Sequence, residues 1–201
     1  PHSLIFKGYN DAKIKYTSYS TSNGDILSFD GSNTETFEFY NIEFSNAGNY
    51  GLYIRNVEET VIENCVFKNN GWNGTSLNTV VDSSTSGILG YDSTNTDLQA
   101  FYSGSNASNG GAMRIQNSKV VELIGNECYE NLRGLRLQDC GIGGYGYVSR
   151  NQVYNNIESG IYLASSSYDA SGGCENFTVY NNASKYNANN GILVIGGANN
   201  V

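Results

Sequence analysis

The residues best suited to chemistry are arginines and tyrosines that recur in one short motif, a small residue followed by apolar-x-apolar. The position between the two apolar residues is held in successive copies by Tyr53, Arg114, Arg136, Tyr162 and Leu193. Two positions further on, the copies carry Arg55, Gln116, Gln138 and Ala164. A guanidinium holds a carboxylate or sulfate by paired hydrogen bonds, and a tyrosine packs on the face of a sugar ring. If the copies stack, they predict a site for an acidic sugar.

The predicted substrate-binding residues, which include two aromatic residues from a long insertion, are Tyr53, Arg55, Arg114, Arg136, Gln138, Tyr162, Trp72 and Tyr91. Arg114 and Arg136 would stack about one strand spacing apart, which is unfavourable for like charges unless an anion bridges them. The alternative is an ordinary surface network in which Asp139, Glu127 or Glu130 neutralises the arginines.

Catalytic residues are less clearly indicated, and the candidates are Arg114, Arg136, Asp139, Asp92 and Asp97. β-Elimination on a uronate needs a base for the C5 proton and a cation to stabilise the developing charge on the carboxylate. Either arginine, with Tyr53 or Tyr162, would supply those parts. Hydrolysis needs two carboxylates instead, and the aspartates qualify only by location. The single histidine, His2, is at the start of the chain.

No cofactor and no metal site is predicted, because the sequence has neither a zinc-ligand spacing nor a nucleophile motif. Calcium is the one ion left open. The stretch from Asp92 to Asp97 resembles a calcium loop, but it lacks the glycine and the terminal glutamate of an EF-hand.

Composition restricts the fold and the partners. The 201 residues carry a net charge of −8, which argues against nucleic acid because phosphate binding needs a basic surface. No apolar run approaches the roughly 18 residues of a membrane span. With 24 glycines and 16 tyrosines but only one proline, the chain favours strands and tight turns over a helical bundle.

The strands that must position the arginines belong to an internal repeat. Five stretches match the template Asn-x-x-aromatic-x-Asn, and they span residues 41–46, 64–69, 126–131, 151–156 and 182–187. Uninterrupted copies are spaced by about 22–25 residues, and each period has room for three short strands. This pattern predicts the coils of a solenoid. The template asparagines, and an aromatic stack of Phe44, Phe67, Tyr129 and Tyr154, are expected to hold the coils together.

The repeat resembles the right-handed parallel β-helix of the pectate-lyase-like superfamily, from about Phe37 to Val201 and more faintly from Leu4 to Gly31. The resemblance implies an all-β fold, a solenoid of three short strands per coil. We expect one domain over residues 1–201, excised from a longer protein, because the sequence opens within one predicted strand and stops where another would begin. It does not select a function, because lyases, hydrolases, epimerases, tailspikes and adhesins share this coil.

Two insertions, at about residues 70–111 and 165–173, interrupt the period. The first contains Trp72 and Tyr91, and insertions of this length are usually functional or disordered. Both leave the coil near the same strand, so we expect both to overhang the face that carries the arginines.

The four cysteines fall into two pairs. Cys65 and Cys128 are predicted near the same slot of successive coils, and Cys140 and Cys174 just before the next strands of adjacent coils. Buried cysteine columns are one interpretation, and a Cys140–Cys174 disulfide in an exported protein is the other.

Two functions from different classes follow. The first is a lyase or hydrolase domain that acts on an anionic extracellular polysaccharide, containing uronate or sulfate. The second is a non-catalytic structural or glycan-binding β-helix of a cell-surface protein or phage tailspike. The Asn/Tyr/Gly-rich coils also resemble the disaggregatase-related surface proteins of archaea. Under either function the chain is expected outside the cell or at its surface, beside neighbouring domains of the same protein.

Overall fold

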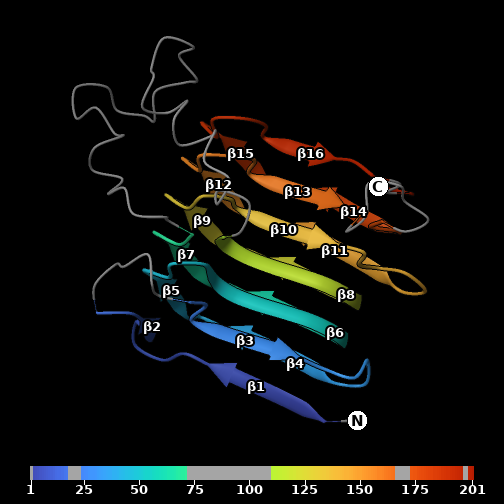
Figure 1. Cartoon of the computed structure of the whole chain (residues 1–201), viewed down its shortest axis with the longest axis horizontal. Helices are drawn as coiled ribbons and strands as arrows, with labels where there is room; N and C mark the ends of the chain where they lie inside the picture. The colour runs from blue at the N-terminus through green and yellow to red at the C-terminus, as the bar shows by residue number, and fades with distance from the viewer. Residues whose placement is uncertain (1, 18–23, 72–109, 166–172, 197–198) are drawn as a thin grey trace.

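The computed structural model describes residues 2–17, 24–71, 110–165, 173–196 and 199–201. This part of the chain is built from strands and turns, without a helix, and therefore without a helix that could cross a membrane. Figure 1 shows the coils stacked in one direction, from β1 near the N-terminus to β16 near the C-terminus. Neighbouring strands in the stack pair in parallel.

Each coil contributes one strand to each of three faces. Face 1 consists of β3 (Leu27–Asp30), the first half of β6 (Tyr50–Glu63), the first half of β8 (Gly111–Ile124), β10 (Leu135–Gln138), β13 (Ile161–Ala164) and β16 (Ile192–Val194). Face 2 consists of β1 (Ser3–Lys7), β4 (Thr36–Tyr40), the second halves of β6 and β8, β11 (Tyr145–Ser149) and β14 (Phe177–Tyr180). Face 3 consists of β2 (Lys13–Lys15), β5 (Glu43–Ser45), β7 (Val66–Lys68), β9 (Glu127–Tyr129), β12 (Gln152–Tyr154) and β15 (Ala183–Lys185).

The core lies inside the coils, where alternate residues of each strand point inward. On face 1 the inward column of Leu52, Met113, Leu135 and Ile161 is fully buried, as the motif predicted. Faces 1 and 2 form one ten-stranded sheet because β6 and β8 continue through the corner between them, whereas face 3 is a separate six-stranded sheet. The predicted all-β parallel β-helix is therefore confirmed.

The corner between faces 2 and 3 depends on left-handed backbone. Five residues share it, with φ between 53° and 65°: Asn41, Asn64, Gly125, Arg150 and Asn181. Asparagine and glycine tolerate this conformation better than other residues. The chain can therefore turn there in every coil.

The predicted equivalence of Asn64 with Asn126 and Asn151 is wrong by one residue. Asn126, Asn151 and Asn182 form a ladder in which each amide oxygen accepts hydrogen bonds from the backbone and side chain of the preceding asparagine, at 2.9–3.0 Å. In the earlier coils this column holds Ile42 and Cys65, and the Cys65 N–H donates to Asn126 Oδ1 at 3.0 Å. The template misaligned the copies because asparagine has two roles in adjacent columns.

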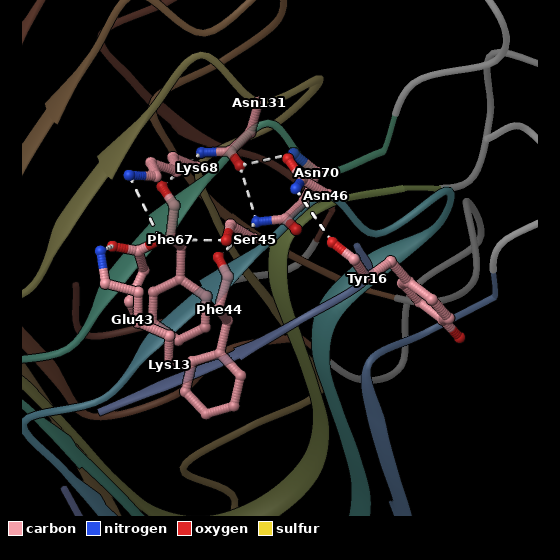
Figure 2. Close-up of polar contacts among 10 residues, drawn as sticks. All are labelled: Lys13, Tyr16, Glu43, Phe44, Ser45, Asn46, Phe67, Lys68, Asn70 and Asn131. Carbon is pink, nitrogen blue, oxygen red and sulfur yellow. Dashed lines mark hydrogen bonds and ion pairs between the residues drawn. The ribbon is translucent and has the colours of Figure 1, made fainter. Parts of the chain in front are cut away.

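The same shift corrects the second asparagine column. Its ladder runs through Asn70, Asn131, Asn156 and Asn187. Figure 2 shows the Asn70–Asn131 step. The predicted members Asn46 and Asn69 come one residue earlier and take the left-handed backbone instead, with φ of 69° and 54°.

The predicted aromatic stack is divided in two for the same reason. Phe44 stacks on Phe67 inside the coil, with ring centroids 4.9 Å apart, whereas Tyr129 stacks on Tyr154 at 5.2 Å. Phe67 pairs with Cys128 and not with Tyr129, which pairs with Lys68. Consequently Cys65 and Cys128 do not share a slot, and that prediction is also wrong.

The two roles of asparagine predict different costs of substitution. Asn126→Ala would leave the buried Cys65 N–H and Ile62 carbonyl without the partners they have now. Each such loss costs about 1–3 kcal/mol, so we expect the free energy of unfolding to fall by about 2–4 kcal/mol. Asn64→Gly, at an exposed left-handed position, should change it by less than about 0.5 kcal/mol. Urea denaturation measures both, and equal losses would contradict this register.

Candidate active and binding site

The arginine–tyrosine column lies on the outer side of face 1. Strand pairing places Tyr53 beside Arg114, Arg114 beside Arg136, and Arg136 beside Tyr162. Each side chain is partly exposed, while both sequence neighbours of each point into the core and are buried. The alternation of the strands therefore turns the four residues outward as one row. A small residue stands two positions before each member of the row: at Gly134, an added Cβ would meet the Gly160 carbonyl oxygen at 2.1 Å.

Each arginine contacts a tyrosine on the side away from the other arginine. The Arg114 guanidinium carbon lies 5.2 Å from the Tyr53 ring centroid, and that of Arg136 lies 5.7 Å from the Tyr162 ring centroid. These distances are in the range of cation–π attraction. The backbones of Arg114 and Arg136 themselves are neighbours in the column, one strand spacing of about 4.8 Å apart.

Face 3 shows how this fold usually treats stacked charges. Glu43 lies between Lys13 and Lys68, with Nζ–Oε distances of 3.0 and 3.2 Å, as Figure 2 shows. Opposite charges thus meet in neighbouring coils. The Arg114–Arg136 pair breaks this rule.

The arginines are held by uncharged groups. Arg114 Nη2 donates to Gln116 Oε1 at 3.1 Å, and the same oxygen accepts from the Tyr53 hydroxyl at 3.3 Å. Arg136 Nη1 donates to the Tyr50 hydroxyl at 3.0 Å. Within the described residues neither arginine has a carboxylate partner among the ion pairs.

The carboxylates proposed to neutralise the arginines lie elsewhere. Glu127 is on face 3, where it accepts a hydrogen bond from the Tyr154 hydroxyl at 2.6 Å. Glu130 has left-handed backbone at the next corner, after β9, and Asp139 at the corner that follows β10. None of the ion pairs of the described residues joins Arg114 or Arg136 to a carboxylate.

Three buried polar atoms on face 1 have no hydrogen-bond partner among the residues that the structure describes: Arg114 Nε and Arg136 Nε in the row, and Gln138 Oε1 two positions beyond Arg136. Native proteins leave few such atoms unpaired, and an absent ion or ligand is one explanation. Burial also lowers the pKa of Arg136, and the positive charges of Arg133 and Arg114 act in the same direction. The arginine remains charged at neutral pH. This part of face 1 therefore combines two desolvated donors of the row with one buried acceptor beside it.

Two residues at the start of face 1 were missed by the sequence analysis. Tyr50, only 1% exposed, receives the hydrogen bond from Arg136. Asp25 Oδ1 accepts from Asn49 Nδ2 at 2.6 Å and from the Tyr50 N–H at 3.0 Å. Burial raises the pKa of Asp25, although these hydrogen bonds and the charge of Arg114 oppose the rise. For Tyr50 the only signal was its place before the small residue of a motif copy, and for Asp25 there was none.

The other arginines near face 1 are already neutralised. Arg133 forms a two-pronged ion pair with Glu158, with Nη2 2.9 Å from Oε1 and Nε bonded to Oε2. Arg55, predicted to bind substrate, is exposed and pairs with Asp30 at 2.5 Å. Of the arginines on or beside face 1, Arg114 and Arg136 are thus the two without an ion pair among the described residues.

The two insertions flank face 1 at opposite ends. Gly71 lies against Gly110 and Gly111, so the first insertion leaves and rejoins the coil at one point just before β8. The second follows β13. The first insertion thus precedes a strand of face 1 and the second follows one, so they leave from opposite edges of this face; whether they overhang the arginines stays a prediction. Trp72, Tyr91, Asp92 and Asp97 lie outside the described residues.

The described residues contain no group of three or more metal-ligating His, Cys, Asp or Glu side chains. Calcium therefore stays a hypothesis for the stretch from Asp92 to Asp97.

Comparison with known proteins supports the coil architecture. A family model described as a right handed beta helix region matches residues 5–201, nearly the whole chain. Searches of the curated proteins and of the solved structures gave no significant match.

The unpartnered charge of Arg136 can be tested through stability. Arg136→Met keeps an unbranched apolar stem and removes a partly buried charge that has no carboxylate partner among the described residues. The free energy of unfolding should stay within about 1 kcal/mol of the parent value, because relief from desolvation offsets the lost Tyr50 hydrogen bond.

Arg133→Met is the matched control, since it leaves Glu158 without its partner, and we expect it to cost about 2–4 kcal/mol. Guanidinium denaturation compares the two variants. A loss of similar size for both would mean that Arg136 has a structural partner.

Proposed function

Because the chain belongs to the right-handed β-helix family, whose coils display side chains in regular outer columns, we propose that face 1 binds an anionic polysaccharide. One observation carries the proposal. Arg114 and Arg136 lie in adjacent coils, partly desolvated, without a carboxylate partner among the described residues. Placing two such charges together is unfavourable unless an anion lies between them.

The remaining groups of the row favour a sugar over a simple anion. Gln138 Oε1 is a buried acceptor without a donor, and a sugar hydroxyl would supply one. Tyr53 and Tyr162, at the two ends of the arginine pair, offer aromatic surface to ring faces. A uronate carboxylate or a sulfate ester suits the guanidinium groups equally, because both present paired oxygens.

Cleavage of that polysaccharide is the second candidate, and two residues beside the row, Tyr50 and Asp25, favour β-elimination. A base removes the C5 proton, its electrons form a C4=C5 double bond, and the C4–O4 bond breaks while O4 takes a proton. The Tyr50 hydroxyl lies at the guanidinium of Arg136. Asp25, whose carboxyl keeps its proton to a higher pH than an exposed aspartate, can act as the acid. Hydrolysis, which needs a pair of carboxylates at the scissile bond, stays the alternative.

The cellular setting belongs to the same proposal. A domain that binds an acidic matrix or cell-surface glycan acts outside the cell or at its surface, next to other domains of its protein. Tailspikes, adhesins and disaggregatase-related archaeal surface proteins are settings in which such a coil would serve. The net charge of −8 makes the local positive charge of face 1 more selective, because the rest of the surface repels acidic polymers.

Binding should depend on Arg136. Isothermal titration with oligogalacturonate and with dextran sulfate should show that Arg136→Gln weakens binding roughly tenfold or more, since a hydrogen bond to a charged group contributes about 1.5–3 kcal/mol. Added salt should weaken the parent interaction, because screening reduces the ionic contact.

Arg55→Gln is the control: Arg55 is exposed and already paired with Asp30, so its loss should change the affinity less than about twofold. Neutral dextran should not bind with comparable affinity. If binding survives the combined substitution of Arg114 and Arg136 by glutamine, the site is not on face 1.

The reaction products distinguish a protein that only binds the polysaccharide from one that cleaves it. If the chain only binds, incubation with a polyuronate yields neither new reducing ends nor the ultraviolet absorbance of a C4=C5 double bond, and this is the outcome we expect. A rise in both signals would instead establish elimination, and Tyr50→Phe should then abolish them while binding persists. New reducing ends without absorbance would indicate hydrolysis.

A further inference from the structure

A pair of buried thiols lies at the corner that follows face 1. Cys140 and Cys174 are each 0% exposed. They belong to adjacent coils, because the Glu175 N–H donates to the Cys140 carbonyl at 2.9 Å. Nothing in the proposed glycan site uses either sulfur.

The two sulfurs occupy equivalent places in their coils. Cys140 Sγ contacts the Gln138 carbonyl oxygen at 3.2 Å, and Cys174 Sγ contacts the Ala164 carbonyl oxygen at 3.7 Å. Gln138 and Ala164 are paired residues of β10 and β13. Each thiol also influences the titration of the other: Cys174 contributes to raising the pKa of Cys140, and Cys140 to lowering that of Cys174. They therefore stack in one column.

This geometry fits a disulfide. Residues stacked in neighbouring parallel strands have Cα atoms about 4.8 Å apart, within the range of roughly 4.4–6.8 Å that a disulfide spans. Cys65 and Cys128 provide an internal contrast. Cys128 pairs with Phe67, two residues beyond Cys65, and such diagonal neighbours lie about 7–8 Å apart, at or beyond that limit.

We propose that Cys140 and Cys174 form a disulfide that fastens two adjacent coils to each other in an oxidising compartment. The oxidant is a small-molecule disulfide such as oxidised glutathione. A cysteine thiolate attacks one of its sulfurs, forms a mixed disulfide and releases one small thiol. The second cysteine, after losing its proton, attacks the protein sulfur of that mixed disulfide and releases the other small thiol. Two protein thiols are oxidised, and one small disulfide is reduced to two thiols.

The reaction fits the folding chain better than the finished coil. Both sulfurs are inaccessible in the folded state, so the exchange takes place before the coil containing Cys174 has closed.

The bond would also hold the second insertion. Cys174 follows residues 166–172 almost directly, and Cys140 lies one coil earlier. A covalent link between them fixes the end of this insertion to the edge of face 1. It would stabilise the fold by restricting the unfolded chain over a long loop.

Thiol mapping after oxidative refolding tests the proposal. The chain is unfolded in guanidinium, refolded by dilution into a mixture of oxidised and reduced glutathione, alkylated and digested for mass spectrometry. We expect two of the four thiols to be lost, and the linked peptides to contain Cys140 and Cys174. Cys65→Ala with Cys128→Ala is the matched control, and this variant should still form the bond.

Thermal unfolding gives a second readout. Adding a reductant should lower the unfolding temperature of the oxidised parent chain but leave that of Cys140→Ala unchanged. The proposal is overturned if the refolded parent chain, with a cooperative unfolding transition, retains four thiols, or if Cys65 and Cys128 become linked in equal yield. The mapping of the parent chain needs no variant, so a poorly folding Cys140→Ala would not prevent the test.

Discussion

Parallel hydrogen bonding between consecutive coils is the constraint on which the rest of this molecule depends. Each residue meets its equivalent in the next coil at about 4.8 Å, so the sequence is read in columns as well as along the chain. A residue that can hydrogen-bond to a copy of itself stabilises such a column, and a residue that cannot destabilises it. Asparagine belongs to the first kind, because its amide donates and accepts at once, and two columns of this protein consist of it.

Arginine belongs to the second kind, which makes its place on face 1 informative. In a single sheet strand, one arginine between polar residues would be unremarkable. In a column, Arg114 and Arg136 must be neighbours whatever their rotamers, and the fold has not supplied the acidic residue that it supplies between Lys13 and Lys68. The unpaired atoms Arg136 Nε and Gln138 Oε1 point to the same conclusion from hydrogen bonding instead of charge. Function is thus inferred from a departure from the rule that the other columns follow.

The sequence predicted the parts of the fold that repeat with a period and missed those that do not. The inward column of Leu52, Met113 and Leu135 and the outward row that includes Arg136 follow from the alternation of a strand, which needs no tertiary information. The asparagine register failed because Asn64 and Asn126 look alike in sequence, while one turns the backbone and the other bonds inside the coil. Only the strand pairing separates these roles. Asp25 belongs to no motif copy and reaches the row through the fold alone.

The meeting of Gly71 with Gly110 has a consequence for how this protein can be modified. The coil closes across that contact, through the bonds from Gly71 N to the Ala47 carbonyl and from Gly111 N to the Asn49 carbonyl, so the chain between the two glycines does not set the spacing of the strands. Doubling the length of a flexible loop costs only about 0.6 kcal/mol. The Gly71–Gly110 junction is therefore a suitable insertion point. A foreign peptide or a small domain with close termini could be displayed there without rebuilding a coil.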